Sequence, residues 1–167
     1  MWIFVRFGGA CDAELLFVPA GQTVDDQPAD SDEQIVHVDT GYGQFDHHQY
    51  DDTTLSAAEL VRRAIAPNDK VLQRLVDHVT RLDHADYPGQ YPVFFNINDL
   101  IAGYNMLFPN RPHHVARAML SNFDAWYEHE ARELRLEQAF ASRLEFSTQW
   151  GLGIAMQSDD GASSRSP

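Results

Sequence analysis

The residues best suited to chemistry lie within positions 36–49, where two carboxylates and two adjacent imidazoles occur close together. Asp39 is followed, across a turn that contains two glycines, by Asp46, His47 and His48. Carboxylate oxygens bind hard divalent ions, and imidazole nitrogen extends the choice to manganese, iron, cobalt and zinc. This combination favours a transition metal over magnesium.

The two neighbouring histidines can take different roles. Adjacent side chains in an extended segment point in different directions, so one imidazole can bind metal while the other contacts substrate or transfers a proton. The alternative is a polar surface loop, and this explanation fits His113-His114, to which we assign no function. The pair at 47–48 differs because Asp39, Asp46 and a glycine turn accompany it.

The elements expected to position these residues begin with short apolar segments in the first third of the chain. Segments 2–7 and 34–39 are rich in aromatic or β-branched residues, which predicts strands, and 15–18 is a further apolar run. The acidic segment 22–33 between them is expected to be a solvated loop. Asp39 would then close a strand at the edge where α/β folds collect functional groups.

The chain shows helical periodicity from residue 56 onward. Ser56-x-x-Glu59 has the form of a capping box, and Asp83 and Asp86 lie at the end of an amphipathic stretch. Helices are expected over 57–65, 71–82, 97–107 and from Pro112 to about Leu144, followed by a strand pair or a single bent strand within 145–156. The predicted fold is an α/β domain over 1–157 with a mostly parallel sheet, flanking helices and a helical second half; 158–167 is expected to be a disordered polar tail.

Composition narrows the classes of function. The chain has 167 residues, 44% of them hydrophobic, and a net charge of −13. That charge argues against duplex DNA as a partner. A single cysteine, no apolar run long enough to cross a bilayer and no secretory start predict a cytoplasmic protein without membrane association. A monomer and a homodimer both stay open.

Three stretches resemble motifs of the DHH phosphoesterase superfamily. Segments 38–41 (Val-Asp-Thr-Gly) and 45–49 (Phe-Asp-His-His-Gln) look like its second and third motifs, and the glutamine after the histidines is closest to the melanocyte-proliferating-gene family of metal-dependent hydrolases. Segment 82–86 (Leu-Asp-His-Ala-Asp) is similar to a later motif with two aspartates three positions apart. The resemblance covers most of residues 34–156.

The resemblance implies a role for each matching residue. Asp39 and Asp83 would bind or bridge metal, His47 would be a ligand, His48 would face the phosphoryl group, and Asp46 would orient His47 and support catalysis. Asp86 would be either a ligand or a partner for a donor at the helix end. The implied cofactor is Mn²⁺, with Zn²⁺, Fe²⁺, Co²⁺ or Mg²⁺ as alternatives, and two such ions can lower the pKa of a bridging water.

The superfamily's first motif is degenerate here. Only Asp12 is left as a plausible ligand there; Cys11 is either a soft ligand or a small buried residue, and Arg6 either contacts a phosphate or is a solvent-facing charge. Two functions therefore stay open: a metal-dependent phosphoesterase acting on a small phosphorylated molecule or short oligonucleotide, or a degenerate relative that binds metal or a phosphorylated ligand without turnover. A purely structural or partner-binding role is the least favoured.

Overall fold

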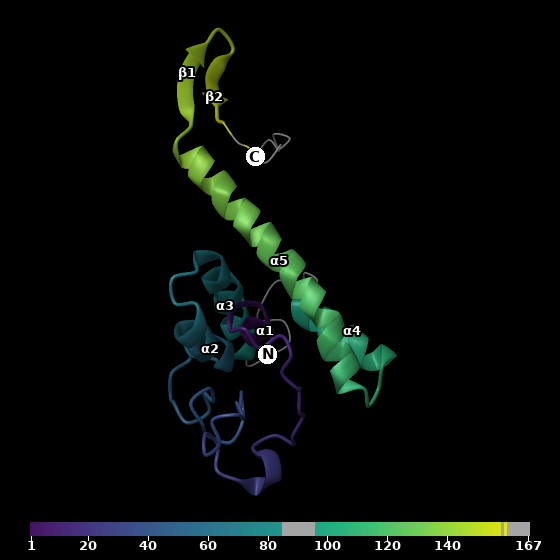
Figure 1. Cartoon of the computed structure of the whole chain (residues 1–167). Coiled ribbons are helices and arrows are strands. Elements are labelled where there is room, and N and C mark those ends of the chain that lie inside the picture. Colours follow the sequence, from purple (N-terminus) through teal and green to yellow (C-terminus); the bar gives the residue numbers. More distant parts are fainter. Residues whose placement is uncertain (85–95, 158, 160–167) are drawn as a thin grey trace.

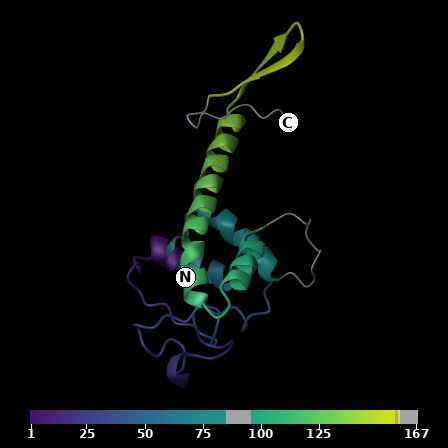
Figure 2. The same cartoon turned by 90° about the vertical axis from the view of Figure 1, so that its right-hand side faces the viewer.

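The computed structural model describes residues 1–84, 96–157 and 159, about half of which are helical (Figure 1). Helices α1 to α3 pack beside the first half of the long helix α5, and α5 carries a small hairpin away from them (Figures 1 and 2). The elements in chain order are α1 (Trp2–Phe7), the 3-10 turn η1 (Val24–Asp26), α2 (Ala57–Ile65), α3 (Lys70–Asp83), α4 (Ile97–Leu107), α5 (Pro112–Ala141), β1 (Leu144–Thr148) and β2 (Gly151–Ala155).

The predicted α/β fold with a mostly parallel sheet is wrong. In the described part of the chain, the one sheet is the antiparallel pair β1–β2, and segments 15–18 and 34–39 form no strand. Segment 2–7 is the helix α1 instead. A segment of six residues is too short for periodicity to distinguish a strand from a helix. Its conformation therefore depends on packing against the rest of the fold.

One carboxylate of α5 accepts hydrogen bonds from two side chains of α1. Asp124 Oδ1 accepts hydrogen bonds from Trp2 Nε1 at 2.9 Å and from Arg6 at 2.6 Å. Residues four apart lie about 6 Å from each other on a helix but more than twice as far apart on a strand. On this helix both donors lie on one face and reach the same carboxylate.

The expected helices in the second half are confirmed, apart from the end of the last one. Helix α5 stops at Ala141 rather than near Leu144, and the predicted strand pair is a hairpin. Ser56 Oγ accepts from Glu59 N at the start of α2, as predicted, but the Glu59 carboxylate accepts from Arg62 and Arg63 instead of completing a capping box.

The core lies where α1, α2 and α3 meet α5. The apolar stripe of α3 supplies much of it, and Phe45 joins from the loop that carries the histidines. The buried cluster consists of Trp2, Ile3, Phe45, Val61, Leu72, Leu75 and Val76. The expected tail, 158–167, lies outside the described residues except for position 159. None of the helices described is both long and apolar enough to span a bilayer.

Candidate metal centre

The loop that carries the site is irregular, but backbone contacts anchor it to the core. Val38 and Phe45 form an isolated parallel bridge, and the Asp39 amide donates to the Phe45 carbonyl at 3.0 Å. The Phe45 ring is buried and meets the edge of Phe4 with centroids 5.4 Å apart. The closed loop therefore holds Asp39 close to the residues that follow Phe45.

The turn inside this loop needs left-handed backbone conformations. Asp39 has φ 61°, Gly41 φ 74° and Tyr42 φ 55°. A left-handed residue other than glycine costs roughly 1–2 kcal/mol, although aspartate tolerates it better than most. At Gly41 a Cβ would lie 2.4 Å from Thr23 Cγ2, so glycine is required there for space as well as for φ.

Asp46 organises the loop through its carboxylate. It is 2% exposed and accepts hydrogen bonds from the Tyr42 amide at 2.8 Å, the His48 amide at 3.1 Å and His48 Nδ1 at 2.6 Å. Burial alone would raise the pKa of Asp46, but the bonds from His48 and Tyr42 outweigh it and lower that pKa. The expected contact with His47 is thus corrected: Asp46 orients His48.

The hydrogen bond between Asp46 and His48 also changes the pKa of His48. Its imidazole is half exposed, and the hydrogen bond to Asp46 raises the pKa of His48 above its usual value, against a smaller opposite effect of burial. The negative charges of Asp39 and Asp83 also raise the pKa of His48. A protonated His48 offers a hydrogen bond or a proton to an anionic ligand.

His47 lies at the centre of the site. It is 9% exposed, with Nδ1 3.2 Å from Asp39 Oδ1 and Nε2 3.2 Å from Asp83 Oδ2. The approach to Asp39 lacks hydrogen-bond geometry, so Nδ1 is buried without a partner. Unsatisfied buried polar atoms are rare because they cost about 1–3 kcal/mol each.

The end of α3 completes the surroundings of His47. Asp83 is the last residue of that helix, and His84 follows with Nε2 2.6 Å from the Leu55 carbonyl oxygen. The rings of His47 and His84 stand nearly perpendicular, 5.5 Å apart. His84 was not among the residues chosen from sequence, although its position next to Asp83 at a helix end was a usable signal.

The described residues contain two groups whose ligand atoms all lie within 4.8 Å of one another, and His47 belongs to both. One group is Asp39, Asp46, His47 and His48; the other is His47, Asp83 and His84. Two atoms bound to the same ion at about 2.1 Å lie about 3.0–3.5 Å apart. The 3.2 Å between Asp39 Oδ1 and His47 Nδ1 fits that separation.

The first-motif residues do not join this site. Asp12 and Cys11 are exposed in the chain after α1, and neither belongs to the two groups. The suggestion of a buried Cys11 is therefore wrong. Arg6 pairs with Asp124 at 2.6 Å and Glu128 at 2.8 Å. Asp86 lies outside the described residues.

The second histidine pair has structural contacts. His113 packs against the ring of Phe17, and His114 packs against Phe108. Both histidines are exposed at the start of α5. Neither belongs to the two groups described above.

The chain was also compared with known proteins. No protein family, curated protein or solved structure matches it. The geometry of the site therefore carries the functional argument.

Proposed function

We propose that this chain binds a divalent transition-metal ion, with Mn²⁺ as the first candidate, through His47 Nδ1 and Asp39. The observation that carries the proposal is the buried Nδ1 without a partner beside a carboxylate oxygen at 3.2 Å. When Nδ1 carries a lone pair, it faces the negative oxygen unfavourably unless a cation lies between them. A metal ion supplies that cation.

Asp83 explains why Nδ1 is the nitrogen left for the ion. Its carboxylate lies 3.2 Å from Nε2, on the other side of the ring. Metal-binding histidines usually direct their second ring nitrogen at a carboxylate or carbonyl, which sets the tautomer and strengthens the ligand. In this proposal Asp83 positions the His47 ring and does not itself bind the ion that His47 Nδ1 binds.

We propose hydrolysis of a small phosphoester as the reaction. A bound divalent ion polarises a phosphoryl oxygen and lowers the pKa of a coordinated water. His48 is held by Asp46 and has a raised pKa. In its protonated form it donates a hydrogen bond or a proton to the phosphoryl group. The resemblance of segments 38–41, 45–49 and 82–86 to the DHH motifs supports the same reaction class.

A second candidate, binding without turnover, is favoured by one specific observation. Asp12 stays outside both groups, so the degenerate first motif supplies no ligand for a second ion. A single ion binds a phosphorylated ligand but stabilises the leaving oxygen less well than a pair of ions does.

The experiment is metal binding by wild-type protein, His47→Ala and the matched control Asp51→Ala. Asp51 is an exposed acid in the same region that belongs to neither group. Wild type and the control should bind one Mn²⁺ and melt at a higher temperature when it is added, whereas His47→Ala should do neither. A wild type without bound metal or thermal stabilisation would refute the proposal.

Turnover separates the two candidate functions. With Mn²⁺ bound, release of phosphate from phosphomonoesters, or of nucleotides from short oligonucleotides, supports hydrolysis if His48→Ala abolishes it and leaves metal content unchanged. Binding of phosphorylated ligands without cleavage of any of them supports the second candidate.

A further inference from the structure

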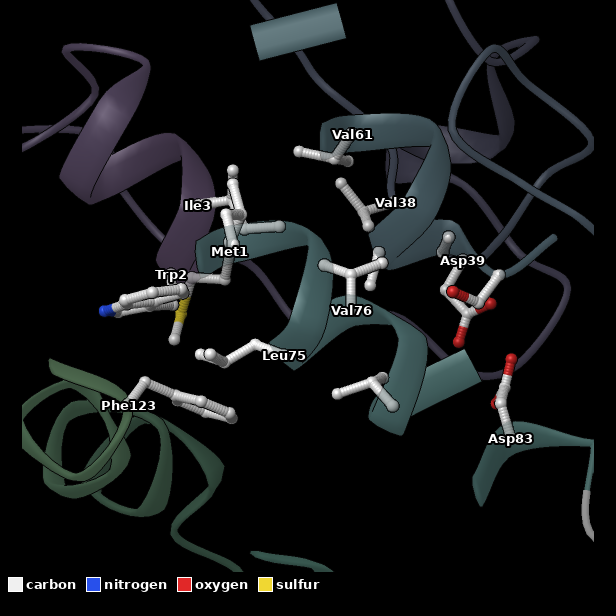
Figure 3. A pocket seen from close by; sticks show the side chains of 15 residues that line it. Met1, Trp2, Ile3, Val38, Asp39, Val61, Leu75, Val76, Asp83 and Phe123 are labelled. Atoms are coloured by element: carbon white, nitrogen blue, oxygen red, sulfur yellow. The ribbon is translucent and has the colours of Figure 1, made fainter. Parts of the chain in front are cut away.

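A cavity of about 300 Å³ opens beside the proposed metal centre, between α1, α2, α3 and α5. Asp39 and Asp83, the two carboxylates that flank His47, lie together at one end, while Trp2 and Phe123 lie at the other (Figure 3). The walls between these ends are almost entirely apolar: Ile3, Val61, Leu72, Leu75 and Val76 belong to the buried core, and Val38, Ala58 and Val79 are partly exposed.

The polar atoms in the cavity wall are mostly occupied. Ser56 is 1% exposed, and its hydroxyl bonds to Thr80 Oγ1 at 2.7 Å and accepts from the Glu59 amide. Trp2 directs its Nε1 to Asp124 rather than to the cavity. Among the side chains of the cavity wall, those of Asp39 and Asp83 are therefore the ones that carry charge.

We infer that the ligand of this site joins its phosphoryl group to a compact apolar group, such as an aryl or branched alkyl group, which occupies the cavity. This inference rests on the proposed function, because the metal at Asp39 and His47 binds the phosphoryl end. Small-molecule sites of this kind combine apolar walls with a few polar groups that set orientation.

The same geometry disfavours sugar phosphates and oligonucleotides. Ribose hydroxyls placed against these walls would lose their water without gaining hydrogen-bond partners. A second or third phosphate would also be repelled by a chain whose net charge is −13. A cavity of about 300 Å³ suits a group of roughly six to ten carbon atoms.

Calorimetry with non-hydrolysable phosphonates tests this inference on the whole chain. Mn²⁺ binding is measured first, and phenylphosphonate, methylphosphonate and ribose 5-phosphate are then titrated into the Mn²⁺-saturated protein. Phenylphosphonate should bind about tenfold or more tightly than methylphosphonate, because the ring leaves water for apolar walls. Ribose 5-phosphate should bind no better than methylphosphonate.

Two substitutions locate the effect in the cavity. Val79 lines it one turn before Asp83, whereas Val71 lies on the same helix, is also partly buried and does not line it. Val79→Phe should remove the preference for the phenyl group and keep Mn²⁺ binding, and Val71→Phe should keep both. If Val79→Phe does not fold, Ala58→Leu on the opposite helix α2 fills the same space.

The outcomes separate the two proposals. Mn²⁺ binding with equal affinity for the phenyl and methyl compounds, or a preference that survives both cavity-filling substitutions, overturns the inference and leaves the proposed metal site standing. Absence of Mn²⁺ binding overturns the proposed function and this inference with it.

Discussion

At the scale of single residues, His47 is the group whose environment most needs explanation. Its ring nitrogens lie 3.2 Å from two different carboxylates, neither contact is a hydrogen bond, and Nδ1 is fully buried. Asp39, His47 and Asp83 lie close together, as expected, and the two aspartates face opposite edges of the His47 imidazole. Asp39 and Asp83 therefore receive different roles, although their side chains are the same.

The difference between these two aspartates is testable by amide substitution. Asp39→Asn should nearly abolish Mn²⁺ binding because it removes a charged ligand. Asp83→Asn keeps the ring in place without the charge and should weaken Mn²⁺ binding by roughly 10- to 100-fold, as loss of a carboxylate behind a histidine ligand does. Isothermal titration with Mn²⁺ measures both. Equal losses in the two variants would show that Asp83 binds the ion directly.

Gly41 offers a second test at this scale. Replacement by alanine adds a Cβ 2.4 Å from Thr23 Cγ2 at a φ of 74°, so Gly41→Ala should lower the free energy of unfolding by about 2 kcal/mol and weaken Mn²⁺ binding. Urea denaturation and metal titration are the measurements. The control is Gly9→Ala, where φ is 71° but no atom lies within 4 Å of the added Cβ. An equal loss of stability in this control would show that contact with Thr23 does not cause the loss at Gly41.

At the scale of elements, α2 contains a charged group buried in the fold. Glu59 is 5% exposed and accepts from Arg62 at 2.8 Å and Arg63 at 2.6 Å. Burial alone would raise the pKa of Glu59, but the hydrogen bonds from the two arginines outweigh it and lower that pKa below its usual value. The folded state thus favours the ionised form of this carboxyl.

The lowered pKa predicts how stability depends on pH. A carboxyl whose pKa is lower in the folded state adds stability above its unfolded pKa, near 4.5, and this contribution disappears as pH falls through the folded value. Glu59→Gln should cost roughly 2–3 kcal/mol at pH 7, and the cost should shrink as pH falls below 4.5 and through the lower folded pKa. Urea midpoints at several pH values measure the difference. Glu133→Gln, at an exposed pair with Arg132, should show little effect at either end.

At the scale of the whole molecule, the hairpin stands apart from the helices that hold the site (Figures 1 and 2). Its strand residues are exposed almost throughout, including Leu144 at 71%, Leu152 at 68% and, in the turn, Trp150 at 87%. An isolated two-stranded hairpin is only marginally stable in water, and large exposed apolar patches mark interaction surfaces.

We therefore expect copies of the chain to associate through this hairpin. The double substitution Trp150→Ser and Leu152→Ser should lower the average mass seen by sedimentation at high protein concentration and leave Mn²⁺ binding unchanged. Met106→Ser, at an 84% exposed position on α4, is the matched control and should not change the mass. A wild type that stays monomeric at every concentration would contradict this expectation.

The sequence alone predicted the local features of this protein. Helices α2 to α5 and the hairpin follow from periodicity, caps and glycines, which act between residues close along the chain. The choice of Asp39, Asp46, His47, His48 and Asp83 followed from side-chain chemistry and motif resemblance. Structure places all five near one another, and their metal binding stays a prediction.

Only the tertiary structure decided the fold class and the partners within the site. Short apolar segments such as 2–7 suit a strand or a helix equally, and the helix α1 is seen in contact with Asp124, more than a hundred residues away. In the same way, the pairing of Asp46 with His48 and the approach of Asp83 to His47 depend on how a loop closes and where α3 ends. Such distant contacts leave no periodic trace in the sequence, because their energy comes from packing that the complete fold creates.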